Sequence, residues 1–136
     1  LHRAVHVFAV NRHGEVLLQK RSRFKDVHPS VWDSSVAGHL DSGEDYATAA
    51  IRELEEEMGI TGVEPREIGR LAPCAATGWE HVVLYLVRWD GPPRFPCSEV
   101  EASLWMKPDE LGAWISARPE DFASGFLECW KLARGL

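Results

Sequence analysis

Three glutamates, Glu53, Glu56 and Glu57, lie three and four residues apart in a segment with helical periodicity. At about 100° per residue, their side chains fall within an arc of roughly 100° on one face of that helix. Like charges at this spacing repel, at roughly a few tenths of a kcal/mol per i,i+4 pair. A hard divalent cation such as Mg²⁺, which takes carboxylate and phosphate oxygens as ligands, would relieve the repulsion. The spacing therefore suits a metal site, although an isolated run of glutamates is more often a solvated helix face.

The helix that must carry these carboxylates is predicted over residues 45–58. Its apolar residues recur at spacings of three and four, which is typical of an amphipathic helix with one buried face. The predicted buried stripe consists of Ala47, Ala50, Ile51, Leu54 and Met58. Ser42 and Asp45 fit a capping box at the helix start, and Gly59 stands where a helix C-terminus favours glycine.

The residues around this helix follow a longer pattern. Five residues separate Gly38 from Glu44, and seven more separate Glu44 from Arg52. The run that follows is Arg52-Glu-Leu-Glu-Glu-Glu-Met-Gly-Ile60. At every fixed position and spacing, residues 38–60 resemble the signature of the Nudix hydrolase family.

This resemblance implies an α/β fold, a Nudix-type α/β/α sandwich with a mixed sheet, in a single domain over residues 1–136. It implies that Glu53, Glu56 and Glu57 bind the metal together with the backbone carbonyl of Gly38, and it leaves open which glutamate is the base. Arg52 would orient the carboxylates through its bidentate guanidinium group, a catalytic role. Behind these ligands, the resemblance places two supporting residues, Glu44 and His39.

The reaction implied is hydrolysis of a diphosphate linked to another group, as in a nucleotide or nucleotide-like small molecule. The implied cofactor is Mg²⁺, for which Mn²⁺ can substitute. Such a metal draws charge from phosphate oxygens and lowers the pKa of a bound water, while the protein supplies positioning and electrostatic stabilisation.

The chain is also similar to isopentenyl-diphosphate isomerases, which share this fold. The similarity is carried by spaced residues before and after the signature, among them Asn11, Gly14, Pro29, residues 35–39 and Trp105. By this similarity, two basic residues, Arg21 and Lys25, contact the diphosphate.

The isomerase similarity breaks at two positions. The isomerase reaction needs a cysteine and a glutamate as a proton donor and acceptor. Ala37 occupies the cysteine position, and Val82 occupies the glutamate position when Glu80 is aligned with the other isomerase glutamate. Neither side chain transfers a proton, so a hydrolase is favoured and an isomerase remains the alternative. A non-catalytic diphosphate-binding module is a further alternative, against which the intact signature carboxylates count.

Two neighbouring residues outside the signature are further candidates. Glu80 heads a predicted strand and suits the distal carboxylate that many family members add, with a solvated surface charge as the alternative. Trp79 has a position between loop and strand that suits a substrate contact, whereas Trp32, Trp89 and Trp105 are expected to anchor the core or sheet. Loops around residues 20–30, 73–80 and 92–99 are expected to select the group attached to the diphosphate.

The other elements follow from shorter patterns. Strands are predicted at residues 4–10, 15–19, 31–37 and 100–106 and within 79–89, with a turn at 11–14 joining the first two into a hairpin. A turn or short helix is predicted from Pro108, and a C-terminal helix over 120–132. Strands on both sides of the central helix indicate a mixed α/β domain.

Composition excludes some classes of partner. Fifteen basic and 21 acidic side chains give a formal net charge of −6. This argues against binding a nucleic-acid polymer or a membrane surface, but it permits a small phosphorylated ligand because a metal bridges two anions. Three scattered cysteines without a CxxC pair favour a reduced compartment, and we expect a cytoplasmic protein. The sequence leaves a homodimer open.

Overall fold

The computed structural model describes residues 2–21, 30–92 and 100–134. In these ranges a seven-stranded mixed sheet runs in the order β3-β2-β1-β6-β5, with β4 paired to β1 and β7 paired to β2. The strands are β1 (Arg3–Val10), β2 (Val16–Arg21), β3 (Trp32–Asp33), β4 (Val36–His39), β5 (Arg66–Leu71), β6 (His81–Arg88) and β7 (Val100–Met106). The helices are α1 (Tyr46–Met58), α2 (Pro108–Ala117) and α3 (Ser124–Arg134), with single 3₁₀ turns η1 (Ala75–Thr77) and η2 (Pro119–Asp121).

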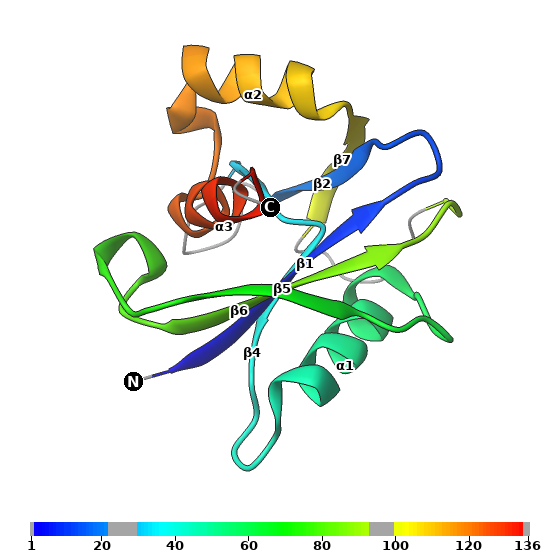
Figure 1. Ribbon diagram of the computed structural model, residues 1–136, viewed down its shortest axis with the longest axis vertical. Helices are drawn as coiled ribbons and strands as arrows, with labels where there is room; N and C mark the ends of the chain where they lie inside the picture. The colour runs from blue at the N-terminus through cyan, green and yellow to red at the C-terminus, as the bar shows by residue number, and fades with distance from the viewer. Residues whose placement is uncertain (1, 22–29, 93–99, 135–136) are drawn as a thin grey trace.

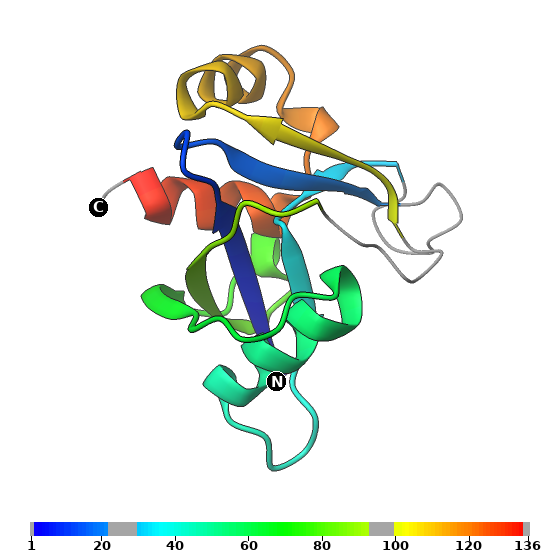
Figure 2. The same ribbon diagram turned by 90° about the vertical axis from the view of Figure 1, so that its right-hand side faces the viewer.

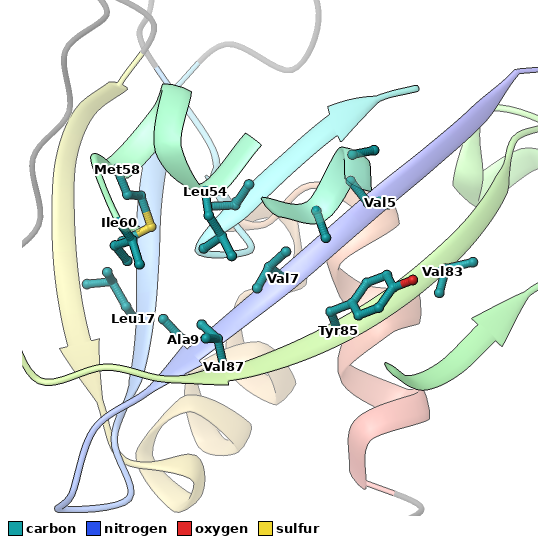
Figure 3. Packing of buried hydrophobic residues seen from close by; sticks show 13 residues of the cluster. Val5, Val7, Ala9, Leu17, Leu54, Met58, Ile60, Val83, Tyr85 and Val87 are labelled. Carbon is teal, nitrogen blue, oxygen red and sulfur yellow. The ribbon is translucent and has the colours of Figure 1, made fainter. Parts of the chain in front are cut away.

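The sheet is covered on both faces, as Figures 1 and 2 show. Alternate residues of β1 point to opposite faces, so Val5 and Val7 join the core under α1 while Ala4 and Phe8 join the core under α2 and α3. Figure 3 shows the first core, in which Leu54 of α1 lies near Val7 and Ala9 of β1, and Met58 lies beside Ile60 and Leu17 of β2. The expected α/β/α sandwich is thereby confirmed.

β1 and β2 diverge from a common end, and this fork creates the space for the site. They pair only at Val10 and Val16. Further along, β4 pairs with β1 from Ala4 to Val7, whereas β2 pairs with β3 and β7. On its other side, β1 pairs with the parallel strand β6 along its whole length. The predicted hairpin is thus correct, but its strands separate after the turn.

The strand predicted over residues 31–37 is wrong as one element, because it divides into β3 and β4 at Ser34 and Ser35. Both serines are fully buried. The backbone N–H of Ala9 donates to the Ser35 hydroxyl (2.8 Å), which in turn donates to the carbonyl of Leu17. Ser35 therefore bridges the diverging β1 and β2, and the break directs β3 to one and β4 to the other.

Helix α1 begins and ends close to the prediction, but its buried face differs. Asp45 is the N-cap and accepts a hydrogen bond from the Thr48 N–H, so Ser42 takes no part in the cap. Ala47 and Ile51 of the predicted stripe are exposed, and Ala49 and Glu53 are buried instead. The helix is rotated because its Glu53 side lies against β4. Gly59 ends the helix in the left-handed conformation (φ 66°), as predicted.

Other elements depart from the predictions at their ends. α2 is a full helix, and α3 begins at Ser124 because residues 119–121 form a separate 3₁₀ turn. β5 was not predicted; none of its residues is buried, and its charged residues Arg66, Glu67 and Arg70 are exposed. Trp32, Trp89 and Trp105 are partly buried and pack against the two cores, as expected. Within the described ranges, no helix has both the length and the apolar character needed to cross a membrane.

Candidate functional site

A cavity of about 800 Å³ opens at the fork of the sheet. It reaches from the signature residues at one end to the first residues of α3 at the other. Its walls come from β1, β2, β4, α1, β6 and the turn before β6, elements that are far apart in the sequence. The predicted site residues that line it are Arg21, Gly38, His39, Arg52, Glu53, Glu56, Glu57 and Glu80.

Glu53 is buried against the backbone of Gly38. A Cβ atom added to Gly38 would lie 2.4–2.7 Å from the three atoms of the Glu53 carboxyl group. No side chain fits in that space, so glycine at position 38 is required for the carboxylate to approach β4. The contact places the Gly38 backbone beside the Glu53 carboxylate, the two groups that the family resemblance implies as metal ligands.

Arg52 connects several of the predicted residues. Its Nε and Nη2 donate to the two carboxylate oxygens of Glu44, each at 2.8 Å. Its Nη1 donates to Glu53 (2.7 Å) and Glu56 (3.1 Å), and Nη2 also donates to the His39 carbonyl (3.0 Å). The hydrogen bonds from Arg52 lower the pKa of Glu44 to about 2, so Glu44 stays ionised and holds the guanidinium in place.

Glu57 lies beside Glu53 and faces β2. Burial, together with the adjacent Glu53 carboxyl group, raises the pKa of Glu57 to about 9. Gln19 of β2 donates a side-chain hydrogen bond to Glu57 at 3.2 Å. Two carboxyl groups in a half-buried contact share a proton unless a cation neutralises them.

The donor atoms at this end of the cavity suit a hard cation, since they are carboxylate oxygens beside a backbone carbonyl. The geometry is that of a closed ion-pair cluster, because the Arg52 guanidinium occupies oxygens of Glu53 and Glu56. In the described part of the chain, no three His, Cys, Asp or Glu side chains are arranged as a ready metal cluster. Glu53 and Glu57 are in direct contact, whereas Glu56 joins them only through Arg52.

His39 and Glu80 meet at the mouth of the cavity. The Glu80 carboxylate contacts Nε2 of His39, which links the end of β4 to the start of β6. Trp79 is 61% exposed and has a positive φ of 62°, but it does not line the cavity, although Gly78 and Glu80 on either side of it do. The structure therefore joins the first two candidates and leaves Trp79 outside the site.

Arg21 is held at the cavity wall by an acidic partner. Its Nη1 donates to Asp33 at 3.2 Å, and Asp33 is 4% exposed. Nε of Arg21 is buried and has no hydrogen-bond partner among the described residues. Lys25, the other predicted diphosphate contact, lies outside the described residues.

Among the residues that line the cavity and were not predicted from the sequence are His6, Gln19 and Asp33. Gln19 and Asp33 are polar residues inside short strands, and each is buried. Gln19 is identifiable from its spacing: it is two residues from Leu17 in β2, so both lie on the same face of the strand, under α1. His6 is two residues from both Ala4 and Phe8 in β1, so it lies on the same face as they do, toward α3. Burial there lowers the pKa of His6 and keeps the ring neutral.

Comparisons with known proteins agree with this geometry. The model of the NUDIX domain family matches residues 1–125. An uncharacterized Nudix hydrolase of Yersinia pestis is 33% identical over 135 residues, which cover 96% of this chain and 70% of that protein. An isopentenyl-diphosphate Δ-isomerase of Nocardia farcinica is 32% identical over 140 residues, covering 98% of this chain and 79% of the relative.

Solved structures show the same relationship. A crystal structure of a Deinococcus radiodurans protein superposes with a TM-score of 0.84 at 29% identity, covering 98% of this chain and 82% of that one. The family match spans most of the chain, and it includes the signature that builds the Arg52 cluster. The chain belongs to the Nudix family and is a Nudix-type pyrophosphohydrolase, a class of enzymes that use divalent metals.

Proposed function

We propose that this protein hydrolyses a diphosphate linkage in a nucleotide or nucleotide-like small molecule, with Mg²⁺ as its cofactor and Mn²⁺ as a substitute. Glu53, Glu56, Glu57 and the Gly38 carbonyl would hold the cation. The observation that carries the proposal is the contact between Glu53 and Glu57 against Gly38, at the head of a cavity large enough for a small substrate.

The residues around the carboxylates have defined tasks in this proposal. The cation, when bound, draws charge from the phosphate oxygens and makes a bound water more acidic. Arg52, fixed by Glu44, orients Glu53 and Glu56, while Gln19 orients Glu57. Arg21, fixed by Asp33, supplies positive charge to a phosphate oxygen of the substrate. The base that takes the proton from water is Glu53 or Glu57, the two carboxyl groups in direct contact.

A substrate screen tests this proposal. Phosphate or nucleotide release is measured with Mg²⁺ over nucleoside triphosphates, nucleotide sugars, dinucleotides, coenzyme A and prenyl diphosphates. Turnover of at least one nucleotide-type diphosphate, abolished by a chelator and restored by Mg²⁺ or Mn²⁺, is the expected result. Undiminished turnover in the chelator would overturn the metal assignment.

An isomerase is the second candidate, because several relatives carry that name. Ala37 and Val82, the positions of the isomerase proton donor and acceptor, both line the cavity and carry no acid or base. We therefore expect no isomerisation of isopentenyl diphosphate. Deuterium incorporation from heavy water into the prenyl chain is the direct measurement, and enzyme-dependent incorporation would favour the isomerase.

A further inference from the structure

Hydrogen-bond donors gather at the end of the cavity opposite the glutamates, where α3 begins. The backbone N–H groups of Ser124, Gly125 and Phe126 have no acceptor among the described residues, as is usual in the first turn of a helix. Ala123 to Phe126 line the cavity, so this turn faces it. A helix N-terminus also carries a partial positive charge.

His6 adds a side-chain donor to this turn. It is 9% exposed, lines the cavity and lies so that its Nε2 would be 3.6 Å from a Cβ atom on Gly125. No hydrogen-bond partner of Nε2 exists within the described ranges. His6 is therefore a buried polar side chain directed at the helix N-terminus with one ring nitrogen left unpaired.

The opposite ring nitrogen determines what Nε2 offers. Nδ1 of His6 is 2.6 Å from the hydroxyl oxygen of Ser34, which is fully buried. The Ser34 hydroxyl has no other acceptor in the described part of the chain, so it satisfies its hydrogen by donating to Nδ1. The neutral ring then carries its own hydrogen on Nε2, which makes His6 a donor into the cavity.

Negative charges near His6 are already paired. Asp33 lies 3.9 Å from Nδ1, on the far side of the ring from Nε2, and it accepts hydrogen bonds from Arg21 and from the Ser34 N–H. Glu80, the other nearby carboxylate, contacts His39. The donors of His6 and α3 are thus left for a ligand that supplies only acceptors.

We propose that Nε2 of His6 and the first turn of α3 form a second oxyanion subsite, which binds a phosphate or carboxylate on the group attached to the diphosphate. This rests on the proposed function insofar as the cavity holds the substrate. Ala4, Ala37 and Val82 also line the cavity, and their apolar side chains leave room for the connecting part of the substrate. The preferred substrates therefore carry an anionic group in addition to the diphosphate that is cleaved.

Amide NMR on ¹⁵N-labelled protein, stripped of metal with a chelating resin, tests the subsite without turnover. Inorganic phosphate and malonate are titrated separately, so that the two arms distinguish a phosphate site from a carboxylate site. We expect saturable shifts of the Ser124, Gly125 and Phe126 amides with at least one of them. Because binding is read without metal or catalysis, failure here is distinguishable from failure of the hydrolase assignment.

Three variants test whether His6 and Gly125 form the anion subsite. His6→Leu removes the donor, and a hydrogen bond to a charged group is worth about tenfold in affinity or more. Gly125→Ala places a methyl group 3.6–3.7 Å from the His6 ring, which fits without strain but fills the subsite, so we expect a similar loss. His13→Leu removes an exposed histidine from the β1–β2 turn and should leave affinity unchanged.

His6→Gln, which keeps an N–H near the Nε2 position, should recover part of the affinity lost in His6→Leu. If His6→Leu does not fold, Gly125→Ala alone decides. The proposal is overturned if neither anion shifts these three amides, or if Gly125→Ala binds as tightly as His13→Leu.

Discussion

The glutamates of the signature are chemically identical, but their surroundings differ. Glu53 is buried against Gly38 and Glu57 is half-buried beside it, while Glu55 and Glu56 are exposed. Glu56 reaches the cluster through Arg52, and Glu55 points away from it. Sequence spacing on a helical wheel predicts this division, because Glu55 lies roughly 160° from Glu53. What the wheel does not show is that two of the carboxyl groups touch.

Replacing single glutamates with glutamine separates these roles. Glutamine keeps the size and helix propensity of glutamate nearly unchanged. Glu57→Gln and Glu56→Gln each remove a charge from the proposed metal site, so kcat should fall by about 10² or more, which is about 2.7 kcal/mol in the barrier. Turnover of one substrate at saturating Mg²⁺ is the measurement.

Glu55→Gln is the matched control and should stay within a few-fold of the parent. Equal losses at all three positions would contradict the placement of the site. A loss confined to Glu55→Gln would put the active face on the opposite side of the helix.

Gly38 allows a second test at single-residue scale. In Gly38→Ala, the new methyl group overlaps the Glu53 carboxyl, so Glu53 must move away from β4. We expect kcat/KM to fall by about 10² or more, with weaker metal binding measured by calorimetry. Gly112→Ala is the control, because Gly112 lies in α2 with open space around it and should gain about 0.5–1 kcal/mol of stability with unchanged activity. Unchanged metal affinity in Gly38→Ala would exclude the proposed role of this contact.

At the scale of elements, the local signals of α1 predicted its ends better than its buried face. Gly59 predicts the end of α1 because its left-handed φ is a local property of the chain. The buried stripe was wrong at Ala47 and Ile51 because burial of Glu53 depends on β4, a contact that the helix sequence does not contain. The helix sequence therefore did not show how α1 is rotated about its axis, because Glu53 of the signature is buried where an apolar residue was expected.

The strands likewise divide into those that the local sequence predicts and those that depend on distant contacts. β1, β6 and β7 have β-rich or apolar runs and were predicted. β5 pairs with β6 at the edge of the sheet and carries polar residues, so no periodicity marks it. The break at Ser34 and Ser35 follows from long-range hydrogen bonds to Ala9 and Leu17, which cannot be read from the segment itself. His6 and Asp33 were missed because their places in the site depend on distant segments, Ser34 and the start of α3 for His6 and Arg21 for Asp33.

The cap at Gly59 yields a stability prediction. Alanine pays the steric cost of the left-handed conformation, so Gly59→Ala should lose about 1 kcal/mol of unfolding free energy. Asparagine tolerates this conformation better, and Gly59→Asn should lose less. Urea unfolding followed by circular dichroism gives both values. If the two variants were equally stable, the cap would not be set by backbone conformation.

Across the whole molecule, the site exists only when distant segments fold together. Residues of β1, β2, β4, α1 and β6 converge on one cavity, and its acidic end concentrates charge in a chain whose net charge is already −6. Arg52 offsets part of this charge through Glu44, Glu53 and Glu56. The repulsion between the Glu53 and Glu57 carboxyl groups is not offset by Arg52, so a proton or a cation must neutralise it.

A cation that binds only the folded protein should therefore stabilise the whole fold. Binding adds RT ln(1 + [L]/Kd) to the unfolding free energy, about 2.7 kcal/mol at a hundredfold excess over Kd. For a domain of this size, such a gain raises Tm by several degrees. We expect Tm to be lowest in EDTA and to rise with excess Mg²⁺ or Mn²⁺.

Glu57→Gln should melt at or above the parent in EDTA, because it removes the carboxyl contact, and it should gain less from metal. Glu55→Gln should gain as much from metal as the parent. If the parent showed no shift, or Glu57→Gln the full shift, the cation would not bind at this cluster.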